Sequence, residues 1–288
     1  MSRPNFFNQS VPRAILAVIL VMLAGGEGKA LAEESPQRGY RFLPDHLDYR
    51  HYIADPKRPR IGASVLKGDE GEVNYDTAIG GAFALLDLPS GPPPFERLQV
   101  AGFAGVFSRF DYNEHYDEIG SDYRAGLSIS AVHDPWAVRL QYFHESDHLG
   151  DEYILREGIT DREVYLREEI GIGVSYFPFA DVRLYAEGAY SIFTGTINDP
   201  WRFQAGIEWE GGPRLPLGFR LYAAGDMQIH QDLDWNPDWT AQAGVVKWDD
   251  GRYRSLRLFA EGHLGHDPLG QFFLENFDYG SIGFAFEF

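Results

Sequence analysis

The last nine residues, 280–288, alternate between two kinds of side chain. The apolar positions are Ile282, Phe284, Phe286 and Phe288, and the positions between them are small or polar. Successive side chains of a strand point to opposite faces, so this pattern is typical of a strand with one face in an apolar medium and the other against polar groups. The sequence therefore predicts a sheet whose two faces meet different environments.

The same alternation recurs along most of the chain. In 123–132, for example, Tyr123, Leu127 and Ile129 share one face, and Arg124 lies on the other. Runs of about ten residues can cross a hydrocarbon layer when they are tilted. A soluble β-sandwich would also alternate, but it would not send charged residues one way and Trp, Phe and Leu the other way on nearly every strand.

The fold is therefore predicted to be all-β, a 12-stranded antiparallel transmembrane β-barrel of the bacterial outer membrane. The expected strands cover roughly 60–66, 74–86, 97–109, 122–132, 136–146, 162–177, 182–193, 201–210, 218–230, 239–248, 253–263 and 271–288. Short and long connections alternate between these strands, as they do in such barrels.

The N-terminal residues have the three parts of a secretory signal peptide. Arg3 and Arg13 supply positive charge, and residues 14–24 form an apolar run too short to span a bilayer. An A-x-A cleavage sequence, Ala30-Leu31-Ala32, follows, so export through the Sec pathway is predicted. The predicted parts of the chain are the signal peptide at 1–32, a periplasmic N-terminal segment at 33–59 and the outer-membrane barrel at 60–288.

Composition limits the chemistry and the partners. The formal net charge is −18, which excludes nucleic acid as a partner because phosphate binding needs clustered Lys and Arg. The chain has no Cys, so thiol catalysis and Cys-ligated metals are also excluded.

The inward positions of the predicted barrel carry both signs of charge. In a narrow bore, mixed charges form ion pairs that fill it, whereas a selective pore carries rings of one sign. The first functional interpretation is therefore a barrel with a mostly filled polar lumen, structural or transport-associated, with an unknown ligand. The inward charges are Arg97, Arg124, Arg139, Arg167, Glu169, Arg183, Glu187, Arg202, Glu208, Arg220, Asp226, Arg257 and Glu261.

A second interpretation comes from His144 and Ser146, which lie two residues apart on the lipid-facing side near the outer end of their strand. Side chains at this spacing project side by side, so the imidazole can accept the hydroxyl proton. If Val138 pairs with Tyr176 across the next hairpin, Glu168 is a diagonal neighbour of His144. Nucleophile, base and carboxylate are the parts of a serine hydrolase. The alternative function is therefore an outer-membrane lipid esterase that uses Ser146, His144 and Glu168.

The run His144-Glu145-Ser146 resembles the His-x-Ser of two lipid-active barrel families, outer-membrane phospholipase A and the lipid A deacylases. The resemblance implies a serine nucleophile and a histidine base on the outward face, with a later Glu in the deacylases. The sequence departs from both families at Asp147, where each has Asn. The Ser-Arg-Ser-Trp-Asn-Arg segment of the phospholipases is also missing.

A longer resemblance covers most of the chain after the signal peptide. Phe42-Leu43-Pro44, the run IADPKRPR at 53–60 and the run HESDHLGDE at 144–152 are similar to an uncharacterised bacterial family, domain of unknown function twelve-oh-seven. This resemblance implies an outer-membrane barrel but no activity. The terminal strand resembles the segment that directs such barrels to their assembly machinery, so Phe288 is expected to contact that machinery.

The loops suggest cations. His148, Asp151 and Glu152 offer nitrogen and oxygen ligands for a metal within a short stretch. No cofactor is expected to be required, but acidic rims are expected to bind Ca²⁺ weakly or to share the cations that bridge lipopolysaccharide, so outer-membrane lipid and lipopolysaccharide are the expected partners. A hydrated acidic loop is the plainer interpretation. The acidic loop residues are Asp111, Glu114, Asp117, Glu118 and Asp122 in one loop and Asp232, Asp234 and Asp238 in another.

Overall fold

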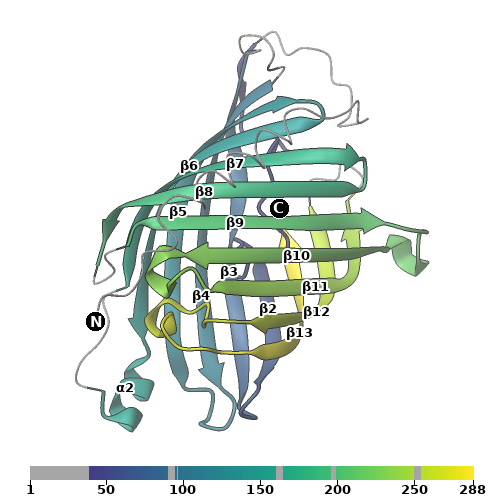
Figure 1. The fold of residues 1–288 in the computed structure, drawn as a ribbon. Coiled ribbons are helices and arrows are strands. Elements are labelled where there is room, and N and C mark those ends of the chain that lie inside the picture. The colour runs from purple at the N-terminus through teal and green to yellow at the C-terminus, as the bar shows by residue number, and fades with distance from the viewer. Residues whose placement is uncertain (1–38, 90–94, 96, 160–164, 196–198, 250–253) are drawn as a thin grey trace.

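The computed structural model describes residues 39–89, 95, 97–159, 165–195, 199–249 and 254–288. The predicted signal peptide at 1–32 and its cleavage site lie outside these residues. The described residues form a closed barrel of twelve antiparallel strands, β2 to β13 (Figure 1). The barrel is closed because β13 pairs with β2 as well as with β12. The predicted fold is confirmed.

The barrel strands follow one another around the wall in chain order. A short strand, β1 (Arg41–Phe42), adds to the edge of β3 beyond the point where β2 begins. The twelve barrel strands are β2 (Ile61–Gly68), β3 (Val73–Leu88), β4 (Arg97–Asp111), β5 (Glu118–His133), β6 (Trp136–Leu149), β7 (Leu166–Phe179), β8 (Val182–Thr194), β9 (Trp201–Gly211), β10 (Arg220–His230), β11 (Pro237–Trp248), β12 (Ser255–Leu264) and β13 (Tyr279–Glu287).

The prediction of the last strand is wrong at its start. Strand was expected from residue 271, but this stretch contains a 3₁₀ helix, η3 (Gly270–Phe272), and the strand begins only at Tyr279. The intervening loop is held to the end of β12 because the backbone N–H of Phe277 donates to the carbonyl of Gly265 at 2.8 Å.

The two ends of the barrel differ. One end, called here the short-turn end, carries tight turns such as His133–Trp136 between β5 and β6, together with the C-terminus and η1 (Pro216–Gly218). The opposite, long-loop end carries α2 (Asp151–Glu157), η2 (Gln231–Leu233) and η3 (Figure 1). None of the helices in the described part of the chain is long and apolar enough to span a membrane.

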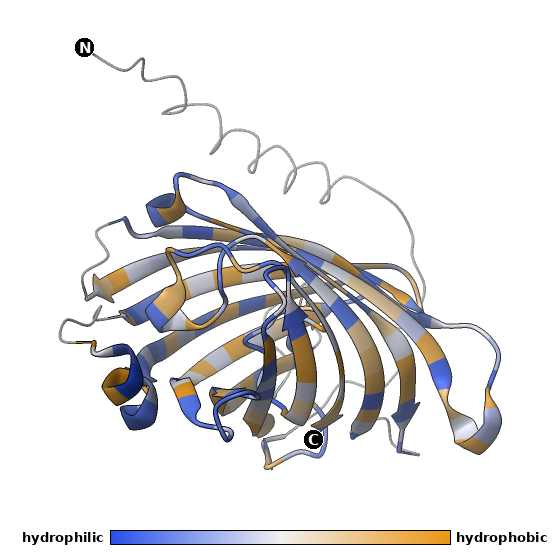
Figure 2. Ribbon diagram, turned by 90° about the horizontal axis from the view of Figure 1, so that it is seen from below, coloured by the Kyte–Doolittle hydropathy of each residue, from blue (hydrophilic) through white to orange (hydrophobic). Residues whose placement is uncertain are grey.

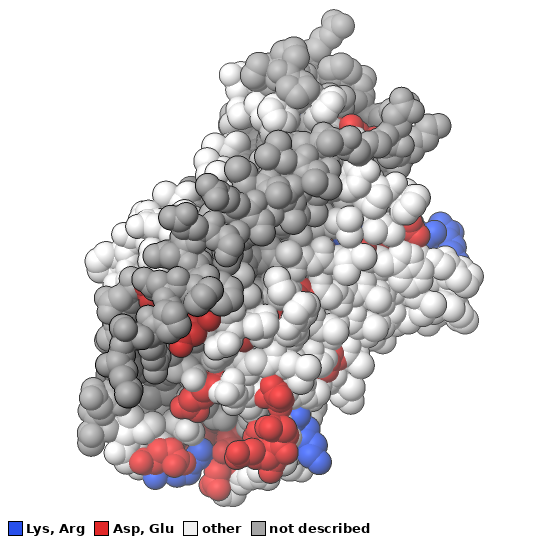
Figure 3. Space-filling model, viewed as in Figure 1, with Lys and Arg blue, Asp and Glu red and all other residues white. Residues whose placement is uncertain are grey.

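The two faces of the wall have opposite chemistry, as the alternation predicts. Apolar and polar residues alternate along the strands (Figure 2). The outward side chains include Ile172 (57% exposed), Ile207 (52%) and Ile282 (67%). A broad part of the barrel surface in view carries few charges, while Asp and Glu gather at the long-loop end (Figure 3). The outside of the wall is thus an apolar belt.

The inward charges form buried ion pairs. Arg202 on β9 bridges Glu169 on β7 at 2.6 Å and Glu187 on β8 at 2.8 Å, and Arg139 on β6 also contacts Glu187 at 2.8 Å. Glu169 and Glu187 are buried, so each carboxylate depends on these partners for its compensation. The pairs join nearby strands on the inner face of the wall, as the mixed inward charges predict.

The N-terminal segment lies inside the barrel. After β1, residues 44–60 enter the lumen at the short-turn end and return to it at the start of β2; they are called here the plug segment. Tyr52, Ala54 and Arg58 are at most 1% exposed. Its polar composition predicts a periplasmic position, and the structure differs because the polar groups of the segment find partners in the lumen.

These partners line the middle of the wall. The hydroxyl of Tyr52 donates to Glu187 at 3.1 Å, and the backbone N–H of Ile53 donates to Glu208 at 2.7 Å. Ile53 and Ala54 also pack in a small apolar cluster with Val246 and other wall residues. The plug segment is therefore bound by both polar and apolar contacts.

The tip of the plug segment reaches toward the long-loop half. Lys57 forms an ion pair with Asp122 on β5 and lies 3.8 Å from Glu145 on β6. On the return path, Arg58 contacts Glu287 at 3.0 Å, next to the short-turn end. The segment thus closes the bore through much of its length.

Candidate functional site

The predicted Ser146, His144 and Glu168 lie on the outward face, near the long-loop end. On β7 the outward series runs through Ile170, Ile172 and further apolar residues, and Glu168 interrupts it. A carboxylate that faces an apolar medium loses hydration, so such a residue is a functional candidate by default.

The register between β6 and β7 places His144 directly opposite Glu168. The pairing predicted from sequence, Val138 with Tyr176, is wrong by two residues, because Trp136 is the residue opposite Tyr176. The rings of Trp136 and Tyr176 stack with centroids 4.4 Å apart, and this aromatic pair lies at the start of the hairpin. The shift brings the histidine and the carboxylate closer than the sequence predicts.

The distance between His144 and Glu168 suits a base and its orienting carboxylate. Ser146 does not complete a triad with them in this structure. Nδ1 of His144 lies 3.6 Å from Oε1 of Glu168. The side chains are 44% and 35% exposed, so both are accessible from outside the barrel. Ser146 is half-buried beside them on the same face, opposite Leu166 and Tyr123. Among the described residues, no hydrogen bond joins Ser146 to His144.

The residue after Ser146 differs from the pattern of the resembling families. The carboxylate of Asp147 accepts hydrogen bonds from its own backbone N–H and from that of Tyr165. Asp147 lies within β6, where an asparagine has nearly the same shape without the charge. The carboxylate next to Ser146 in the sequence therefore distinguishes this chain from those families.

The residues predicted to bind a metal are not gathered. His148 ends the outward series of β6 and contacts the ring of Tyr123 with centroids 5.8 Å apart, while Asp151 and Glu152 form the first turn of α2. In the described part of the chain, no group of three or more His, Asp or Glu residues is arranged to hold a metal ion.

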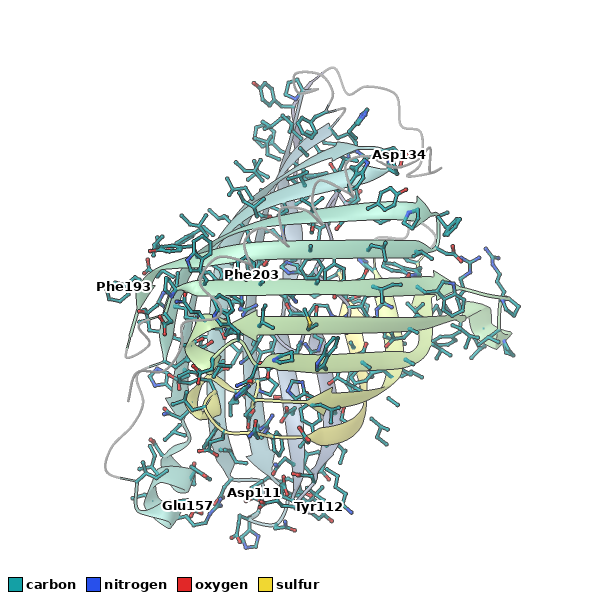
Figure 4. The ribbon with its side chains drawn as sticks, viewed as in Figure 1. Asp111, Tyr112, Asp134, Glu157, Phe193 and Phe203 are labelled. Carbon is teal, nitrogen blue, oxygen red and sulfur yellow. The ribbon has the colours of Figure 1, made fainter. Side chains whose placement is uncertain are left out.

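The acidic rim is partly neutralised by one arginine. Arg156 of α2 contacts Asp111 at 3.1 Å, Asp117 at 3.2 Å and Glu157 at 3.0 Å. Asp111 and Glu157 lie at the long-loop end, away from Asp134 at the other end (Figure 4). The arginine thus ties α2 to the loop between β4 and β5. Binding of Ca²⁺ by this rim stays a prediction.

The described part of the lumen also contains a cavity. A cavity of about 70 Å³ remains between the plug segment and the long-loop end, bounded among others by Lys57, Glu169, Leu233 and His263. A polar space of this size is large enough to hold ordered water.

The sequence matches a family described as "Protein of unknown function (DUF1207)" over residues 29–288. Among curated proteins, none matches the chain. The fold is similar to outer membrane phospholipase A from Escherichia coli, with 10% identity and a TM-score of 0.52 over 79% of this chain and 92% of that one. It is likewise similar to the Salmonella typhi phospholipase dimer with bound calcium, with 12% identity and a TM-score of 0.50 over 79% and 91%.

Proposed function

The chain belongs to the DUF1207 family of proteins of unknown function, and we propose that it is a lipid esterase of the bacterial outer membrane. Ser146 acts as nucleophile, His144 as general base and Glu168 as the carboxylate that orients the base. The observation that carries this proposal is the pairing of His144 with Glu168 on the apolar outer face, two residues from a serine. The likeness to the phospholipase barrels supports the fold and not the activity.

The reaction follows from the positions of these groups. Oγ of Ser146 attacks the carbonyl carbon of a lipid ester while His144 takes the hydroxyl proton. Glu168 stabilises the imidazolium that forms. The tetrahedral intermediate expels the lipid alcohol, which receives the proton from His144, and an acyl group stays on Ser146. A water molecule that gives its proton to His144 then releases the fatty acid and restores Ser146.

The outward position decides the class of substrate. A substrate that reaches Ser146 must come sideways from the apolar layer, because Ser146 lies on the outward face of β6 together with His144. The site also lies near the long-loop end, where ester bonds of a bilayer lipid meet the polar region. Catalytic hydrogen bonds often tighten only when substrate binds, so the Ser146–His144 bond is expected in the complex.

The test is fatty acid release by the refolded full-length barrel in mixed micelles of detergent and phosphatidylethanolamine. We expect turnover that Ser146→Ala reduces by about a thousandfold or more. Ser128→Ala, on the inward face of β5, is the matched control and should keep activity. His144→Gln should behave like Ser146→Ala, and His148→Gln, four residues along the same strand, should not.

Two results would overturn the proposal. Turnover unchanged in Ser146→Ala would remove the serine from the reaction. Absence of release from phosphatidylethanolamine, phosphatidylglycerol and lipid A by a correctly folded barrel would remove the activity itself.

The other function that the sequence suggests is transport through the lumen. The plug segment argues against an open pore, since it carries buried Tyr52 and Arg58 across the bore. A transport-associated role would need this segment to leave the barrel, which a conductance measurement detects.

A further inference from the structure

Glu168 has a second partner on the outward face. Tyr142 lies two residues before His144 on β6 and shares its face. Its hydroxyl donates a hydrogen bond to Oε2 of Glu168 at 3.1 Å, while Oε1 of the same carboxylate is the oxygen 3.6 Å from Nδ1 of His144. The two oxygens of one carboxylate are therefore divided between the tyrosine and the histidine.

The surroundings make this division important. Tyr142 is 40% exposed on the apolar belt and lies opposite Ile170 on β7. A carboxylate beside hydrocarbon is poorly hydrated and tends to take up a proton. A hydrogen bond donated to the charged form opposes this, because it replaces part of the lost hydration. Only an ionised Glu168 can stabilise an imidazolium on His144.

We infer that Tyr142 is a positioning residue of the lipid-facing site. Its hydroxyl holds the Glu168 carboxylate turned so that Oε1 faces His144. This inference rests on the proposed esterase function and adds a fourth residue to its site. The plainer role for an outward tyrosine is to anchor the barrel with its hydroxyl toward the lipid headgroups. Tyr142 differs from that role because its hydroxyl is bonded to a protein carboxylate.

The test is Tyr142→Phe in the refolded full-length barrel, assayed on phosphatidylethanolamine micelles. We expect kcat to fall about tenfold with KM changed less than about twofold, since the hydroxyl acts through Glu168 and not on the lipid.

The matched control is Tyr190→Phe. Tyr190 is an outward tyrosine on β8 with 42% exposure, against 40% for Tyr142, and its ring contacts Trp201. It should keep the wild-type kcat and the wild-type KM. A change shared by both variants would mean that loss of any belt hydroxyl disturbs the barrel, and would overturn the inference.

The same substitution made in a variant that lacks the Glu168 carboxylate distinguishes a positioning role of Tyr142 from a structural one. In Glu168→Gln the carboxylate that Tyr142 positions is absent, so adding Tyr142→Phe should cause little further loss of kcat. Equal losses in both backgrounds would make the role of Tyr142 structural and would overturn the inference. If Tyr142→Phe matches wild type while Ser146→Ala is inactive, the inference fails and the esterase stands. If no turnover depends on Ser146, both fail.

Discussion

The ring of Tyr52 stacks on the ring of Tyr185, with centroids 3.8 Å apart and planes at 5°. This contact fixes the plug segment against the inner face of β8. The hydroxyls add to it, because Tyr52 donates to Glu187 and Tyr185 donates to Asp226 at 2.6 Å. An N-terminal segment held in this way belongs to the folded barrel and is part of its seal.

Removing the plug segment should open the bore. Residues 46–58 can be replaced by a Gly/Ser linker of about ten residues, which is long enough to join β1 to β2. The remaining lumen carries paired charges that water can hydrate, so we expect ion conductance in planar bilayers where the wild-type barrel shows none.

The control for this experiment changes the same region without emptying the lumen. Tyr40 and Leu43 are 67% and 68% exposed, so the double alanine variant should stay closed. A linker variant that folds, shown by its heat-modifiable migration in gels, yet carries no current would contradict the plugging role.

Arg202 should be a strong determinant of stability. It is the cation that bridges Glu169 and Glu187, and both carboxylates are buried. Arg202→Met keeps the bulk of the side chain and leaves uncompensated charge, so the free energy of unfolding should fall by about 3–5 kcal/mol. Denaturant titration followed by tryptophan fluorescence measures it. Lys67→Met, on the exposed face of β2, should change it by less than about 1 kcal/mol, and a similar loss in both variants would count against the bridge.

The strands could be predicted because one physical cause produces their pattern. Side chains at alternate positions meet an apolar medium or a polar lumen, and the period of two appears in Leu127 and Arg124 or in Phe284 and Ala285 without any knowledge of partners. The opposite charges of the inward face also predicted ion pairs between strands, and Arg139 pairs with Glu187.

The plug segment and the register depend on distant partners, which a local pattern does not contain. Tyr52 meets Tyr185 and Ile53 meets Glu208 across more than a hundred positions of sequence, and neither pair follows a periodic rule. The predicted register of β6 on β7 was wrong by two residues, since alternation fixes only the face of a side chain and not its partner. The stacking of Trp136 on Tyr176 is the signal that could have corrected it.

Asp147 should limit the reaction at its neighbour. An ester oxygen gains negative charge when Ser146 attacks, and a carboxylate one residue away disfavours that charge. Asp147→Asn keeps the shape and removes the charge, so kcat on phosphatidylethanolamine should rise severalfold. Asp151→Asn on α2 removes an equal charge farther along the chain and should leave kcat unchanged. A lower kcat in Asp147→Asn would show that the hydrogen bonds of the carboxylate matter more than its charge.

Two exposed aliphatic residues, one on a wall strand and one on a helix at the long-loop end, test whether the apolar belt faces hydrocarbon. Ile172 is 57% exposed in the middle of β7, and Leu155 is 82% exposed on α2 at the long-loop end. If hydrocarbon surrounds the wall, Ile172→Arg should lower the free energy of folding into phospholipid vesicles by about 2–4 kcal/mol, because the charge must enter the bilayer. Leu155→Arg should cost less than about 1 kcal/mol, since α2 lies outside the strands and meets water. Reversible folding into vesicles in denaturant gives both values. Equal costs would mean that Ile172 faces water, and the lipid-facing site on the same strand would lose its premise.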